Sequence, residues 1–167
     1  MSESSNLRDA ASAATHRDYE QTLHGAGLFD VTDRGKVELT GGDANSFLHN
    51  LCTNDILNIP IGAGCEAFLT TAKAKVVAHL LVYHLLLHND QEALWLDVAP
   101  GMAEKVIKHL DHFLISEQVE FADRTGQFAQ MHLAGPRAND VLEKALGERI
   151  PKLELLQHMM RTFPDIG

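Results

Sequence analysis

The sequence predicts an α+β fold with a mainly antiparallel sheet and helices packed against it. Strand-like segments occur in hairpin pairs, and single amphipathic helices separate these pairs without the strict βαβ alternation of a parallel sheet. The longest apolar run, FLTTAKAKVVAHLLVYHLLL over 68–87, has too many apolar and β-branched residues for one helical stripe. Its second half, residues 76–87, is therefore predicted to be a long, largely buried strand in the middle of the sheet.

The composition limits the classes of function. The chain has 167 residues with 14 basic and 23 acidic side chains, a net charge of −9. This acidic balance and the absence of a Lys/Arg run argue against nucleic acids and anionic membranes as partners. No apolar run reaches the roughly twenty residues of a membrane span, and the N-terminus has no secretory or transit signal. Cys52 and Cys65 show neither metal nor redox spacing. Together these features predict a cytoplasmic protein.

The first third of the chain is predicted to begin with a flexible tail over residues 1–12. A helix over 13–24 should end at the following Gly-Ala-Gly sequence, because glycine accepts the left-handed conformation of a helix end. Two short strands with a turn between them then follow, over 28–31 and 36–40.

A second helix is predicted to begin after Asp43, whose side chain should cap the free N–H groups of the first turn. Its apolar residues fall on one buried stripe: Ala44, Phe47, Leu48 and Leu51. A loop then leads to a strand over 65–71, and a turn over 71–74 enters the long strand. Residues 88–91 form a hairpin turn to a return strand over 93–98.

The last third is predicted to start with a helix near Pro100, since proline suits the first helical turn. Its apolar face consists of Met102, Val106, Ile107, Leu110, Phe113 and Leu114. Strands over 119–122 and 128–133 follow, and a final helix begins at 135–136. The buried stripe of that helix is predicted to be Ala138, Val141, Leu142, Ala145 and Leu146. Residues 13–167 are expected to form one domain.

Alternation along the long strand places His79, Leu81 and Tyr83 on one face, an unusual row for a plain core and a candidate ligand surface. Histidine can exchange protons near neutral pH, but no carboxylate lies beside His79 in the sequence, and this favours a structural histidine. Tyr83 fits a flat ligand and a core position equally well, and both interpretations stay open. His109 and His112 lie three apart on a predicted helix without a third ligand, so no metal site is predicted.

Several segments, taken in order, resemble the glycine-cleavage T-protein (aminomethyltransferase) superfamily. GLFDVTDRGKVELTGGDANSFLHNLCTNDI resembles the opening of that family, VVAHLLVYHL its long strand, and GPRANDVL its G-P-x-A segment. The resemblance covers about residues 27–146. It implies that residues 13–167 are the N-terminal part of a T-protein-like folate-binding domain, with tetrahydrofolate as the cofactor.

The departures from the family pattern affect the site. The family's aspartate pair before L-x-V-Y is replaced by Ala78-His79, so no catalytic residue is assigned and an active aminomethyltransferase is not expected. Position 66 carries Glu66 where the family shows a tyrosine. By the resemblance, the residues expected to bind the cofactor are His79, Leu81, Tyr83, Val98 and Asn54. Asn54 also fits a simple loop cap, and that interpretation is favoured.

The T-x-x-(G/A)-K form and L-D-V-x-x-G before a helix are more similar to the YgfZ-type branch, whose members bind folate and are implicated in maintaining iron–sulfur enzymes. The resemblance therefore implies a folate-binding protein linked to iron–sulfur protein maintenance, with iron–sulfur proteins as partners. The alternatives are aminomethyl transfer to tetrahydrofolate and a truncated module without a ligand. Family chains are considerably longer, so this chain alone is expected to bind folate weakly, expose an apolar patch and dimerise.

Overall fold

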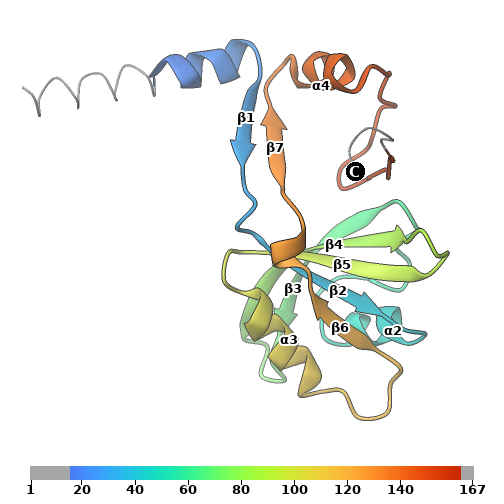
Figure 1. Cartoon of the computed structure of the whole chain (residues 1–167). Helices are drawn as coiled ribbons and strands as arrows, with labels where there is room; N and C mark the ends of the chain where they lie inside the picture. The colour runs from blue at the N-terminus through green and yellow to red at the C-terminus, as the bar shows by residue number, and fades with distance from the viewer. Residues whose placement is uncertain (1–15, 163–167) are drawn as a thin grey trace, which may run out of the picture. The chain divides into compact units, whose positions relative to one another are not determined.

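A computed structural model describes residues 16–162, which form two compact units. The smaller unit contains residues 16–31 and 129–152, and the larger contains residues 32–128 and 153–162. Figure 1 follows the chain through both. The predicted tail over 1–12 lies outside the described residues.

The larger unit is built on one antiparallel sheet of five strands in the order β3-β4-β5-β2-β6 (Figure 1). The strands are β2 (Gly35–Thr40), β3 (Gly64–Thr70), β4 (Val76–Leu86), β5 (Glu92–Val98) and β6 (Glu120–Asp123). The apolar run forms β4, which has 11 residues and lies between β3 and β5. The predictions of a mainly antiparallel α+β fold and of a long interior strand are therefore confirmed.

Two helices, α2 (Ala44–His49) and α3 (Ala103–Asp111), pack against one face of this sheet, here called the inner face. Ala44, Phe47 and Leu48 of the predicted α2 stripe are buried, whereas Leu51 lies beyond the end of the helix and is only partly buried. Phe47 and Leu48 join the core with Val106 and Leu110 of α3. The strand residues on the inner face include Ala67, Leu69, Ala78, Leu80, Val82, Leu94, Leu96 and Val98. Burial along β4 alternates, so the strand is buried on its inner face and partly exposed on the other.

The smaller unit consists of a helix over 16–24, β1 (Gly27–Asp30), β7 (Met131–Ala134) and α4 (Ala138–Leu146). β1 and β7 pair antiparallel as a two-stranded ribbon. The predicted buried stripe of α4 is wrong, since no residue of α4 is buried and Val141 and Leu142 are 44% and 38% exposed. A two-stranded ribbon has no broad face against which an apolar helix stripe can be buried.

Strands that are neighbours in the sequence do not always pair with each other. β1 pairs with β7, whereas β2 lies between β5 and β6. The 3₁₀ turn η1 (Thr125–Gln127) likewise separates β6 and β7, which belong to different sheets. The turns between β1 and β2 and between β6 and β7 therefore exist, but they join strands of different sheets, whereas the turn over 88–91 closes the predicted hairpin of β4 and β5.

The helix starts also differ from expectation. Asp43 does not cap α2, because its Oδ2 accepts a hydrogen bond of 2.8 Å from the backbone N–H of Gln118 and so ties the helix start to the segment before β6. α3 begins at Ala103 and not near Pro100. Among residues 16–162, no helix combines the length and the apolar character needed to cross a membrane.

Candidate functional site

The sheet face opposite α2 and α3, here called the outer face, carries three of the five residues expected to bind the cofactor. Strand alternation places on it Glu66 and Phe68 of β3, His79, Leu81 and Tyr83 of β4, and Trp95 and Asp97 of β5. Cross-strand pairing brings Glu66 opposite Leu81, and Tyr83 opposite Trp95. The expectation that the three β4 residues share one face is confirmed, because the irregularity in β4 lies outside this row.

His79 has a carboxylate partner that is distant in the sequence. Its Nε2 lies 2.6 Å from Oε1 of Glu66, and the two side chains are 43% and 62% exposed. The imidazole also contacts Phe68, which is opposite it in the register, with ring centroids 5.3 Å apart. The premise that His79 lacks a carboxylate is therefore wrong, because the antiparallel pairing supplies one from the next strand.

Tyr83 is half-buried between the strand row and the segment over 153–162. Burial raises the pKa of its hydroxyl, nearby Asp97 raises that pKa further, and Arg34 opposes both. The phenol is therefore protonated at neutral pH and can donate a hydrogen bond. The edge of the His158 ring meets it almost at a right angle, with centroids 5.6 Å apart.

Two ion pairs flank Trp95 on the outer face. Asp97 is 4% exposed and accepts a hydrogen bond from Nε of Arg34. Nε and Nη2 of Arg124 donate to Oε1 of Glu38 at 3.1 and 2.7 Å. Each buried carboxylate thus has a guanidinium partner, which offsets the cost of removing its charge from water. The outer face beside Trp95 is therefore lined by two hydrogen-bonded ion pairs.

The segment over 153–162 lies against β3 and β4 beside Tyr83. The backbone N–H of His158 donates to the carbonyl of Gly62 at 2.9 Å. The pKa of His158 is lowered, mainly because burial disfavours the charged ring, and His84 lowers it further. This segment covers part of Tyr83, so a ligand on Tyr83 would also meet the segment.

Two of the predicted binding residues are not on the outer face. Val98 is fully buried in the inner-face core, and the outer position beside it belongs to Asp97. Asn54 lies in the loop before β3, where its Nδ2 donates to the Glu66 carbonyl at 2.8 Å and its Oδ1 accepts from the Asp55 N–H at 2.8 Å. The loop-cap interpretation of Asn54 is therefore confirmed.

Trp95, Asp97 and Arg34 were not predicted from the sequence. Alternation over residues 93–98 does put Trp95 and Asp97 on one face, and counting back from the hairpin turn over 88–91 would have placed that face beside Tyr83. No sequence signal places Arg34. Within residues 16–162, no three His, Cys, Asp or Glu side chains gather closely enough to hold a metal ion.

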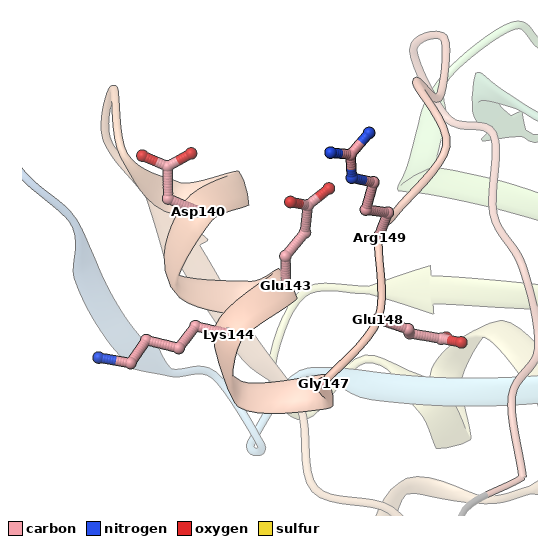
Figure 2. A pocket seen from close by; sticks show the side chains of 6 residues that line it. All are labelled: Asp140, Glu143, Lys144, Gly147, Glu148 and Arg149. Atoms are coloured by element: carbon pink, nitrogen blue, oxygen red, sulfur yellow. The ribbon is translucent and has the colours of Figure 1, made fainter.

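A separate, open cavity of about 460 Å³ lies in the smaller unit, at the C-terminal end of α4 (Figure 2). It is lined by Asp140, Glu143, Lys144, Gly147, Glu148 and Arg149. Figure 2 shows Lys144 pointing away from Arg149. Glu143 is already engaged, since its Oε1 accepts the Ile150 N–H at 2.9 Å. The cavity contains none of the predicted site residues.

The chain is similar to aminomethyltransferases in sequence and in fold. Aminomethyltransferases of Bacillus cytotoxicus and Bacillus mycoides are each 26% identical over 148 residues, which cover 89% of this chain and 39% of theirs. The crystal structure of glycine cleavage system aminomethyltransferase T from Bartonella henselae has the same fold, with a TM-score of 0.69 at 22% identity over 84% of this chain and 37% of that one. The chain thus spans about two fifths of the length of these relatives. The family model described as GCVT N-terminal domain matches residues 3–163, and this chain therefore belongs to that family.

Proposed function

We propose that this chain forms one wall of a tetrahydrofolate site of the aminomethyltransferase type, and that the outer face is that wall. Family membership and the aminomethyltransferases among the relatives support the class of protein. The observation that carries the proposal is the row in which Tyr83 and Trp95 lie opposite each other while Glu66 and His79 pair on the adjoining strands.

The outer face offers the contacts that a reduced folate requires. A pterin is flat and carries N–H donors beside a carbonyl oxygen, and aromatic side chains offer surface to such rings. The protonated Tyr83 hydroxyl is a hydrogen-bond donor, and the exposed Glu66 carboxylate is an acceptor for N–H groups. The residues present therefore fit the ligand.

One wall does not make a closed site. Pockets commonly enclose more than about 70% of a small ligand's surface, and this chain spans only 39% of the length of the relatives. Folate binding by this chain alone is therefore expected to be weak. For the same reason, we expect no transfer from an aminomethylated lipoyl carrier to tetrahydrofolate in a turnover assay of the isolated chain.

Iron–sulfur protein maintenance, suggested by the YgfZ-type motifs, remains a prediction and the second candidate. One of these motifs lies in the turn before β4, where Thr71 Oγ1 accepts the Lys75 N–H at 3.1 Å and Ala74 has a φ of 56°. These contacts account for the motif by the geometry of the turn. The relatives favour aminomethyl transfer over this candidate.

Trp95 makes the proposal testable, because it is the single tryptophan of the chain and lies opposite Tyr83. Titration with 5-formyltetrahydrofolate, corrected with N-acetyltryptophanamide for light absorbed by the ligand, should change Trp95 fluorescence saturably. Tyr83→Ala should weaken binding roughly two- to tenfold, because an aromatic contact contributes about 0.5–1.5 kcal/mol. His88→Ala, in the exposed turn after β4, is the matched control. A strictly linear signal, or equal affinity in wild type and Tyr83→Ala, would refute the proposal.

A further inference from the structure

We infer that Glu66 positions His79 as a proton-exchanging group for a ligand on the outer face. The inference rests on the proposed function for the identity of the ligand, a reduced folate. It assigns His79 to contact with the ligand and Glu66 to positioning of the imidazole.

The contact with Glu66 determines which ring nitrogen of His79 carries the proton. An ionised carboxylate only accepts hydrogen bonds, so Nε2, 2.6 Å from Oε1, must be the donor. In the neutral ring the proton therefore lies on Nε2, and Nδ1 keeps a lone pair. Nδ1 forms no hydrogen bond with any of residues 16–162. The pair thus holds a basic nitrogen unoccupied.

The imidazole is also restrained in orientation. The Phe68 ring contacts the imidazole at a centroid distance of 5.3 Å and an interplanar angle of 46°. The carboxylate of Glu66 holds the ring at Nε2. With 43% of its side chain exposed, His79 is still accessible to a ligand. A free surface histidine would have neither restraint.

Three other histidine–carboxylate pairs occur in the described part of the chain, namely His24–Glu20, His49–Asp55 and His84–Glu92. Nδ1 of His49 already accepts the Ile56 N–H at 3.2 Å. Both nitrogens of His84 are engaged, by Ile59 and Glu92, and its side chain is 7% exposed. His24 is 73% exposed on a helix of the smaller unit and is not one of the outer-face residues. Of these four pairs among the described residues, only the His79 pair combines a fixed ring with an accessible nitrogen on the outer face.

The chemistry is a single proton transfer. When a ligand N–H or O–H meets Nδ1, the bond to hydrogen breaks, its electron pair stays on the ligand atom, and a new N–H bond forms at Nδ1. The adjacent Glu66 carboxylate stabilises the resulting imidazolium, as a carboxylate partner does for a general-base histidine. The reverse step returns the proton.

The test measures the tautomer of His79 and its response to the ligand separately. Long-range ¹H–¹⁵N spectra of the labelled chain at pH 8 should show His79 as a single Nε2–H tautomer, and addition of 5-formyltetrahydrofolate should move its Nδ1 resonance. Glu66→Ala should give mixed tautomers before any ligand is added, a readout that does not depend on ligand binding, and should lose the Nδ1 response. Glu104→Ala, which removes an exposed carboxylate paired with Lys108 on α3, is the control and should change neither signal.

The outcomes distinguish this inference from the proposed function. An unchanged His79 tautomer in Glu66→Ala overturns the positioning role of Glu66. A Trp95 response without any Nδ1 response in wild type overturns the role of His79 and leaves the folate wall standing. No response of either signal to the ligand overturns both.

Discussion

Leu80 and Leu81 are neighbours on β4 but face opposite sides of the sheet, and this makes a sharp stability prediction. Leu80 is fully buried in the inner-face core, whereas Leu81 is partly exposed on the outer face. Leu→Ala removes three carbon atoms, worth about 0.8 kcal/mol each when fully buried, and a residual cavity raises the total to about 2–5 kcal/mol. We therefore expect Leu80→Ala to lose about 2–5 kcal/mol of unfolding free energy, and Leu81→Ala less than about 1.5 kcal/mol.

Urea denaturation followed by Trp95 fluorescence is the appropriate assay, because Trp95 is the only tryptophan and belongs to the larger unit. The two midpoints should differ by more than the error of linear extrapolation, with similar slopes. Equal losses in the two variants would refute the assignment of faces, because they would mean that the outer face is covered as closely as the inner one.

Three further predictions concern groups around the sheet. Burial raises the pKa of the Cys52 thiol to about 12, so Ellman's reagent at pH 8 should react with it many-fold more slowly in the folded chain than in urea. Burial raises the pKa of the Tyr83 hydroxyl, so the protonated phenol contributes fully to the free energy of unfolding below about pH 10, and this contribution is lost as the pH rises further. Urea titrations at stepped pH should therefore show a smaller loss of unfolding free energy at alkaline pH for Tyr83→Phe than for the wild type. A Cβ at Gly64 would lie 2.4 and 3.1 Å from two backbone oxygens, so Gly64→Ala should speed tryptic cleavage within 153–162, whereas Gly126→Ala, with nothing within 4 Å, should not.

Much of the fold could be predicted because side-chain periodicity is a local consequence of backbone geometry. The alternation of β4 and the buried stripe of α2 needed no knowledge of their partners. Pairing between distant strands could not be predicted in this way. Residues 27–30 pair with residues 131–134. The alternating pattern of a strand is the same whichever strand pairs with it, so the pattern does not identify the partner.

The assignment of Val98 to the site relied on position in a family pattern and not on the face of the strand. Val98 was aligned with a ligand-binding position, yet its side chain belongs to the inner-face core. One residue earlier, Asp97 lies on the outer face and pairs with Arg34. Because side chains alternate strictly, an offset of one residue exchanges a ligand-facing position for a core position.

The partnership of His79 and Glu66 depends on an irregular step between β3 and β4. Thr70 pairs with Val76, but Leu69 pairs with Ala78, so Val77 is an extra residue on β4. Such a bulge shifts the register of everything beyond it by one residue. Turn chemistry and alternation give no sign of it, because both strands read as regular in the sequence.

Without this extra residue, counting back from the turn would place Glu66 opposite Leu80 and Ala67 opposite His79. Residues directly opposite in an antiparallel pair point to the same side, so Glu66 would then face the core side of β4 together with the fully buried Leu80. That register would bury the Glu66 carboxylate and expose Ala67. The apolar core has no partner for the carboxylate, so the free-energy cost of removing its charge from water would not be offset. The bulge removes this conflict and brings the Glu66 carboxylate within hydrogen-bond distance of His79. The same feature that lets β3 and β4 share one apolar face therefore also assembles the acid–base pair on the other.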